Sequence, residues 1–313
     1  MIPLLIDTDP GVDDAVALLM AMGSPEARLE AITTVFGNVG LETTTANALR
    51  LLALAGRSDI PVGIGADRPL VFPQPYRAAE WHGPDGLGGL AATLPKPVAR
   101  PDLRGAVQLM ADVLRAAVRP VTIAAIGPLT NVALLLAVHR QLADRIARLV
   151  IMGGALAGGN TTAAAEFNVW SDPEAAHRVL VEEQLPVTLV PLDLTTRVLV
   201  DGKWLLALAA GGERGSILAR VLEHYRVRYR EQVGPDGVLL HDAIAVLEAI
   251  MPGTLRTEPM WLDVICDQGP ARGAVIADER HNAPGRPVDV AVDADLDAVR
   301  AEILHRLVRS ATM

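Results

Sequence analysis

Four aspartates lie close together near the start of the chain, between the apolar runs at 2–6 and 15–20, in the segment Asp7-Thr8-Asp9-Pro10-Gly11-Val12-Asp13-Asp14. Carboxylates packed this closely repel one another unless a positive charge lies among them. A divalent cation with oxygen ligands is the simplest such charge. The segment therefore predicts a metal site where a buried strand ends and a helix begins.

The same residues also fit a simpler role at a helix start. Asp9 before Pro10 matches an N-cap with proline at the first helical position. Asp13 and Asp14 would then lie in the first turn, where the helix dipole favours acids. This alternative explains Asp7 poorly, and it does not exclude a metal, because a capping carboxylate has a second oxygen.

The elements that must position these acids follow from the apolar pattern. We expect strands at 4–7, 29–35, 121–125, 149–152 and 187–191. Helices are expected at 13–22, 43–55, 103–117, 129–138, 173–183, 202–210, 215–232, 240–249 and 296–309. A β-hairpin is expected at 259–266 and 273–277, and a further strand at 288–292. The alternation of strands and helices predicts an α/β fold with a mostly parallel central sheet flanked by helices, Rossmann-like in type.

The chain is expected to form a single domain over residues 1–313, since no Ser/Gly-rich linker divides it and no repeat is present. Residues 62–101 are rich in Gly and Pro and are expected to form a long functional loop. Within it, His82 and four glycines fall in the segment 82–89, a composition suited to a mobile lid. An ordinary flexible loop is the alternative.

Composition excludes several classes of partner. The formal net charge is −9 and there is no basic block, which argues against nucleic acid as a partner. The apolar runs are too short to cross a membrane, and no signal peptide is recognised. Cys266 is the only cysteine, which excludes an intrachain disulfide and suits a cytoplasmic location.

Ligands of such a sheet bind beyond the carboxyl ends of its strands, so polar residues there are candidates for a site. Asn38 follows the second expected strand, residues 126–131 follow the third and Met152 ends the fourth. Each of these signals by itself also fits an ordinary turn or helix start.

Three further groups could bind a substrate. Asn160, Glu166, Phe167 and Asn168 combine amides, an acid and a ring, as a sugar site requires, although loop polarity is an alternative. Tyr225 and Tyr229 share a helix face, which also fits core packing. His241 and Asp242 open an expected helix. Asp242 could complete a metal shell and His241 could reach a reacting group, or Asp242 is only an acid at a helix N-terminus.

Together these motifs resemble the nucleoside hydrolases, the inosine–uridine-preferring N-ribohydrolases. Residues 7–15 resemble the family signature, and the other motifs follow in the family's order at 37–38, 82–83, 127–131, 152–154, 166–168 and 241–242. The resemblance covers nearly the whole chain. It implies the nucleoside hydrolase fold and hydrolysis of the N-glycosidic bond of ribonucleosides to free base and ribose.

The resemblance also implies roles for particular residues. It implies a Ca²⁺ ion bound by Asp9, Asp14, Asp242 and the main-chain oxygen of Ile126. Around the ribose it places Asp13, Asn38, Met152, Asn160, Glu166 and Asn168. Around the base it places His82, Phe167 and Tyr229. A homodimer or homotetramer is implied as well.

A mechanism is expected from these roles. The bond breaks through an oxocarbenium-like sugar, so a water must be deprotonated and the base must be neutralised as it leaves. The hypothesis assigns the Ca²⁺-held water's proton to Asp9 and leaving-group protonation to His241, with Tyr229 as a candidate helper. Asp7 is expected to lie behind the metal ligands.

Two other classes fit part of the pattern. Asp-X-Asp after a first strand also opens the haloacid-dehalogenase-like phosphatases, which need a downstream lysine. Here Asp13 and Asp14 follow instead, and Lys96 and Lys203 are the only lysines. A Ca²⁺-dependent ribose-binding protein without turnover is the second alternative, and the presence of Asp9 and His241 argues against it.

Overall fold

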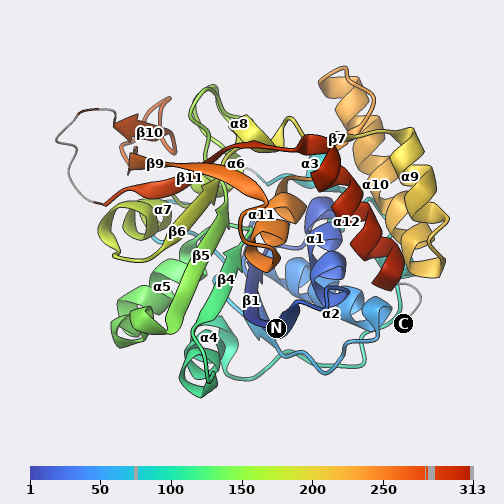
Figure 1. The fold of residues 1–313 in the computed structure, drawn as a ribbon, viewed down its shortest axis with the longest axis horizontal. Helices are drawn as coiled ribbons and strands as arrows, with labels where there is room; N and C mark the ends of the chain where they lie inside the picture. The colour runs from blue at the N-terminus through green and yellow to red at the C-terminus, as the bar shows by residue number, and fades with distance from the viewer. Residues whose placement is uncertain (74–76, 279, 281–285, 311–313) are drawn as a thin grey trace.

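The computed structural model describes residues 1–73, 77–278, 280 and 286–310. In this part of the chain the main sheet is built from β1 (Ile2–Thr8), β2 (Ala27–Thr34), β3 (Val62–Ile64), β4 (Val121–Ala125), β5 (Ile146–Met152), β6 (Val187–Val190), β9 (Leu255–Val264), β10 (Val275–Asp278) and β11 (Val288–Ala294). Their order across the sheet is β10-β9-β11-β6-β5-β4-β1-β2-β3 (Figure 1). All neighbouring strands from β3 across to β11 pair in parallel. β9 pairs antiparallel with both β11 and β10.

Helices cover both faces of the sheet, which is why its central strands are apolar on both sides. One face carries α1 (Val12–Met22), α2 (Leu41–Ala55), α11 (His241–Ile250) and α12 (Leu296–Ser310). The other carries α4 (Gly105–Ala116), α5 (Thr130–Val138) and α7 (Pro173–His177). All five residues of β4 are buried between these layers.

The remaining elements lie mainly around the carboxyl ends of the strands and on one flank. They are α3 (Ala79–His82), α6 (Phe167–Ser171), α8 (Leu192–Thr195), α9 (Gly202–Ala209) and α10 (Glu213–Gln232), with β7 (Leu199–Val200) pairing with β8 (Val238–Leu239). Short non-α helical turns occur at η1 (Ala91–Thr93), η2 (Arg140–Arg145) and η3 (Arg178–Glu182). None of the described helices is long and apolar enough to cross a bilayer.

The structure confirms a single α/β domain with a mostly parallel sheet, and it corrects two local expectations. Residues 62–101 are not one loop, because β3, α3 and η1 interrupt them. The expected helix at 173–183 divides into α7 and the π-helical η3. The expected hairpin, β9 and β10, does form, and through β11 it extends the main sheet.

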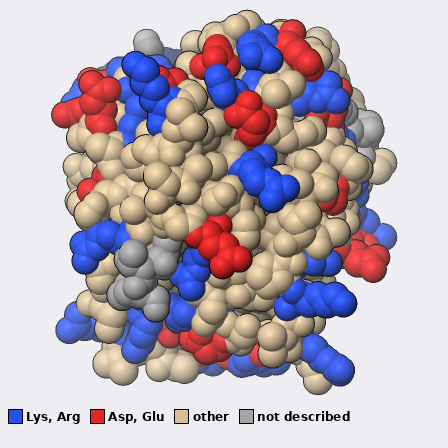
Figure 2. Space-filling view, turned by 90° about the vertical axis from the view of Figure 1, so that its right-hand side faces the viewer, with Lys and Arg blue, Asp and Glu red and all other residues tan. Residues whose placement is uncertain are grey.

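Charged side chains of both signs are interspersed on the face that carries α9, α10 and α12 (Figure 2). On this face Lys and Arg side chains alternate with acidic ones and form no continuous basic patch among the described residues. This distribution is in keeping with a chain whose formal net charge is −9.

One buried ion pair fixes α11, the helix that begins with His241 and Asp242, against the sheet. Arg148 on β5 donates from Nη1 to Glu248 Oε1 at 2.8 Å and from Nη2 to the Glu248 carbonyl oxygen at 2.6 Å. The Glu248 carboxylate also accepts the backbone N–H groups of Gly253 (3.1 Å) and Leu255 (3.0 Å). Its side chain is only 4% exposed.

Replacing Glu248 with alanine should therefore destabilise the fold substantially. The change removes the carboxylate that pairs with Arg148 Nη1 and accepts two backbone N–H groups, while the bond from Nη2 to the residue 248 carbonyl remains. Losing the charged partner of such a pair costs about 3 kcal/mol when the site is buried. Urea unfolding would measure it. Asp59→Ala, which removes the exposed partner of Arg57 at 2.9 Å, is the matched control and should cost less than about 1 kcal/mol. Equal effects from the two substitutions would show that the pair does not anchor α11.

Candidate functional site

The acidic segment lies at the carboxyl end of β1, where the chain turns into α1. The helix begins at Val12 with Gly11 as its N-cap, so the alternative that made Asp9 the cap is wrong. Asp14 closes the turn instead: its Oδ2 accepts the Gly11 N–H at 2.8 Å and its Oδ1 accepts the Thr8 hydroxyl at 2.5 Å. Asp9 is thereby left for another role.

Asp9 is almost fully buried, at 1% exposure. Its Oδ2 accepts the Asn38 N–H at 2.7 Å, while its Oδ1 is buried without a hydrogen-bond partner in the described structure. Two glycines make room for this carboxylate, since a Cβ on Gly37 would lie 1.9 Å from Asp9 Oδ2 and one on Gly127 would lie 2.6 Å from Oδ1. The two loops therefore close tightly around the Asp9 carboxylate, one oxygen of which has no hydrogen-bond donor among the described residues.

Three more carboxylates converge beside Asp9. One oxygen each of Asp13, Asp14 and Asp242 lies within 4.8 Å of the others, although Asp242 is far away in sequence. Burial, followed by repulsion from Asp14, raises the pKa of Asp13 to about 8. Burial and then the charge of Asp13 raise the pKa of Asp242 well above its usual range. Such a cluster is stable in its charged form only when a cation compensates it.

This grouping differs in part from the expected metal ligands. The closest cluster contains Asp13, for which the resemblance implied a ribose contact, together with the expected ligands Asp14 and Asp242. Asp7 lies behind it, with Oδ1 accepting from Thr33 (2.6 Å) and from the Asn131 amide (2.8 Å). Burial raises the pKa of Asp7 to about 7.

A cavity of about 620 Å³ opens above the acids. Its lining includes these expected site residues: Asp13, Asn38, His82, Ile126, Met152, Asn160, Glu166, Phe167, Asn168, Tyr229, His241 and Asp242. Asp9 and Asp14 are not in the lining and lie in the buried cluster that adjoins it. The structure thus brings segments that are far apart in the sequence, from several strand ends and helices, into one pocket.

Several lining residues were not predicted from the sequence, among them Trp81, Trp170, Leu192 and Thr196, whereas Tyr225 had been left between core and site. Trp81 and Trp170 are close in sequence to expected site residues, which was the available signal. The Tyr225 ring stacks on the His82 ring, with 5.6 Å between the ring centroids. It packs T-shaped against the Trp81 ring, with 6.2 Å between the centroids. These rings give one side of the pocket an aromatic wall suited to a planar base.

The polar side of the pocket is organised by Glu166. Its Oε1 accepts the Asn168 N–H at 2.8 Å, and its Oε2 accepts those of Val169 (3.0 Å) and Gly154 (2.9 Å). Glu166 therefore caps α6, and burial raises its pKa to about 7. Asn168 then points its amide at the main-chain oxygens of Ile126 and Met152, both at 3.2 Å.

Two histidines face the cavity as buried rings. His82 Nδ1 accepts the Val12 N–H at 3.0 Å, and burial lowers the pKa of His82 to about 3. Burial likewise lowers the pKa of His241 to about 4. Both rings are therefore neutral at physiological pH, and each can offer one N–H and one lone pair.

The segment expected to be a mobile lid is ordered internally by Asp85, and one bond from α2 joins it to the rest of the fold. The Asp85 carboxylate accepts the N–H groups of Leu87 (3.0 Å), Gly89 (2.8 Å) and Ala91 (2.8 Å). Asn47 on α2 donates to the Asp85 carbonyl oxygen at 2.8 Å. Movement of this segment stays a prediction, and of these contacts only the Asn47 bond links the segment to another element.

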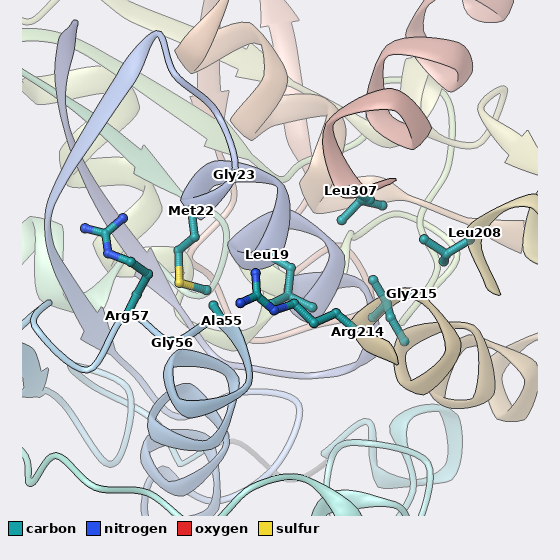
Figure 3. A pocket seen from close by; sticks show the side chains of 11 residues that line it. Leu19, Met22, Gly23, Ala55, Gly56, Arg57, Leu208, Arg214, Gly215 and Leu307 are labelled. Atoms are coloured by element: carbon teal, nitrogen blue, oxygen red, sulfur yellow. The ribbon is translucent and has the colours of Figure 1, made fainter. Parts of the chain in front are cut away.

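A second cavity, of about 450 Å³, lies away from the acids at the carboxyl ends of α1 and α2 (Figure 3). Leucine side chains, Met22 and two arginines, Arg57 and Arg214, line it, and none of the expected site residues does. The chemistry therefore concentrates in the larger cavity.

Comparisons with known proteins identify the family to which this chain is similar. The family model for inosine-uridine preferring nucleoside hydrolases matches residues 4–301. The chain is 39% identical to the pyrimidine-specific ribonucleoside hydrolase RihA of Klebsiella pneumoniae subsp. pneumoniae over 309 residues, 98% of both proteins. It is 40% identical to the RihA of Escherichia coli O9:H4 over 299 residues, 94% of both.

Solved structures give the same result. The purine-preferring ribonucleoside hydrolase from Gardnerella vaginalis superimposes with a TM-score of 0.93 at 31% identity, covering 99% of this chain and 100% of that one. A plant nucleoside hydrolase, PpNRh1, superimposes with a TM-score of 0.91 at 33% identity, covering 97% and 98%. The chain therefore belongs to the inosine-uridine preferring nucleoside hydrolase family and is a ribonucleoside hydrolase, an enzyme that cleaves N-glycosidic bonds.

Proposed function

We propose that this enzyme hydrolyses pyrimidine ribonucleosides to free base and ribose, with Asp9 as the general base and His241 as the donor to the leaving base. The observation that carries the proposal is the buried, unpartnered Oδ1 of Asp9 beside three converging carboxylates at the substrate pocket. The pyrimidine preference rests on the two RihA relatives, which are 39% and 40% identical to this chain over nearly their full length.

The residues at the base of the pocket fit a Ca²⁺ ion. Asp9, Asp14, Asp242 and the carbonyl oxygen of Ile126 would hold it, and all of these donors are oxygens, which hard cations prefer. The unpartnered Oδ1 of Asp9 and the raised pKa values of its neighbours support a missing positive charge here. When bound, Ca²⁺ supplies Lewis acidity toward water and ribose hydroxyls.

Each of these side chains has a separate role in the proposed reaction. Asp9 accepts the proton of the attacking water, for which its Oδ1 is free of other hydrogen bonds. Asp13 and Asn168 hold ribose hydroxyls in the pocket, and the surrounding carboxylates stabilise positive charge on the sugar. His241 directs an N–H at the base as it leaves.

Other residues complete the pocket. Asn38, Met152, Asn160 and Glu166 shape the sugar side, and Glu166 does so by fixing α6. His82, Phe167 and Tyr229 bound the base on the other side. These contacts orient the substrate so that the anomeric carbon faces Asp9.

Three broader proposals accompany this function. We propose that residues 1–313 form one nucleoside hydrolase domain, that the protein assembles as a homodimer or homotetramer, and that it acts in the cytoplasm. The continuous main sheet from β10 to β3 supports the first of these, and the single Cys266 fits the last.

A panel of uridine, cytidine, inosine, adenosine and guanosine tests the proposed function directly. We expect release of reducing sugar, with the highest kcat/KM for uridine or cytidine. 2′-Deoxyuridine is the matched control and should react at least about 100-fold more slowly, because a site that binds a hydroxyl rejects its absence. Preference for a purine nucleoside would refute the pyrimidine assignment, and no sugar release from any nucleoside would refute the function.

Asp9→Asn should lower kcat by roughly 10²–10⁴-fold, the usual contribution of a positioned base. The amide keeps an oxygen for the Asn38 N–H at 2.7 Å, so folding is expected to persist. Asp59→Asn, on the surface, is the control and should leave turnover unchanged. Turnover within a few-fold of the natural enzyme would mean that another group takes the proton.

Calcium should stabilise the protein measurably after chelator treatment. An ion that binds only the folded state at about 100 times its Kd contributes about 2.7 kcal/mol. Thermal unfolding with increasing CaCl₂ should therefore show a rising Tm, and Asp242→Asn should reduce the rise. A Tm independent of CaCl₂ at millimolar concentrations would contradict the metal site.

A further inference from the structure

His241 is held by a side chain that the sequence did not single out. Thr195 Oγ1 lies 2.7 Å from His241 Nδ1. Thr195 is the last residue of α8 and has no exposed surface, whereas His241 borders the substrate pocket. This contact fixes the Nδ1 edge of the ring.

The direction of this hydrogen bond follows from the other hydrogen bonds that Thr195 makes. Its N–H donates to the Pro191 carbonyl oxygen at 3.1 Å, and its own carbonyl accepts the Val198 N–H at 3.1 Å. Only the hydroxyl remains, and within the described residues its one partner is His241 Nδ1. A buried hydroxyl hydrogen without an acceptor costs about 1–3 kcal/mol.

If the imidazole donated from Nδ1, the Thr195 hydroxyl hydrogen would have no acceptor at all. The hydroxyl therefore donates, and Nδ1 carries the lone pair. A neutral imidazole has one N–H, so its proton must lie on Nε2. The neighbouring Thr196 shows the usual alternative, because its hydroxyl donates to the Leu192 carbonyl oxygen of its own helix at 2.7 Å.

The segment carrying Thr195 is itself well fixed. The Leu192 N–H donates to the Gly154 carbonyl oxygen at 3.0 Å. The Asp193 carboxylate accepts the N–H groups of Leu156 at 2.8 Å and Ala157 at 2.9 Å. α8 is thereby joined to the chain that follows β5, and the hydroxyl keeps its place relative to the pocket.

We propose that Thr195 is a positioning residue that locks His241 in the Nε2–H tautomer, so that the ring presents an N–H to the nucleobase. This inference rests on the proposed function, in which His241 faces the leaving base. The ring nitrogens and carbonyl oxygens of a departing base gain negative charge, and an N–H aimed at one of them stabilises it. The opposite tautomer would present a lone pair and repel the same atoms.

Nitrogen NMR of the histidine side chains tests the tautomer without reference to activity. Spectra of ¹⁵N-labelled protein, assigned with His241→Gln, should show protonated Nε2 and unprotonated Nδ1. Thr195→Val should shift this pattern toward a mixture of tautomers, and Thr195→Ser should restore it. Thr44→Val, which removes another buried hydroxyl that donates to Val35 O at 3.0 Å, should leave it unchanged.

Kinetics separate positioning from structural damage. For Thr195→Val we expect kcat on the preferred nucleoside to fall by roughly 10–100-fold, the scale for removing a partner that orients a functional histidine. 4-Nitrophenyl riboside, whose leaving group needs no hydrogen bond, should be hydrolysed at nearly the natural rate. Thr195→Ser should recover most of the loss.

The outcomes distinguish the two proposals. Protonated Nδ1 in the natural enzyme, or equal loss on both substrates with Thr195→Val, would overturn the role of Thr195. Absence of nucleoside hydrolysis in the natural enzyme, together with the expected NMR pattern, would refute the proposed function while leaving the tautomer assignment in place.

Discussion

Burial of four carboxylates at one edge of a parallel sheet is the constraint on which the rest of this structure depends. Asp9, Asp13, Asp14 and Asp242 are at most 5% exposed. Among the described residues that line the adjoining pocket, none is a lysine or an arginine. Charge compensation must therefore come from hydrogen-bond donors, from protonation or from a bound cation.

The fold contains specific features that hold these acids in place. Glycine at positions 37 and 127 lets two loops close around Asp9, where any Cβ would collide with its carboxylate. Asp14 accepts hydrogen bonds from Thr8, Gly11 and Asn38, and this fixes the turn into α1. These contacts hold the carboxylates in defined positions in the absence of any ligand.

The pocket is chemically divided. On one side, the Glu166 carboxylate accepts hydrogen bonds from three backbone N–H groups, one of which is that of Asn168, and so holds Asn168 in place. On the other, Tyr225 and Trp81 form an aromatic wall against His82. The polar half suits a sugar and the aromatic half suits a base, which is the division that a nucleoside itself shows. His241 lies at the pocket too, with its tautomer set from α8.

A buried ion pair connects stability to function. Asp242 and His241 open α11, and the far end of that helix is fixed to β5 through Arg148 and Glu248. The end of α11 that lines the pocket is therefore not the end that Glu248 anchors to the sheet.

The sequence alone determined the features that depend on residues close together along the chain, namely the type of sheet and the strand end that bears the acids. The alternation of apolar runs specified a parallel sheet, and the spacing of Asp7, Asp9, Asp13 and Asp14 marked the strand end that bears the site, because parallel strands deliver their following residues to one edge. Tertiary structure decided that Oδ1 of Asp9 has no hydrogen-bond partner among the described residues, that Asp14 rather than Asp9 closes the helix turn, and that Thr195 meets His241. These outcomes depend on contacts between segments distant in sequence, and their hydrogen-bond directions follow only when every buried donor and acceptor has been counted.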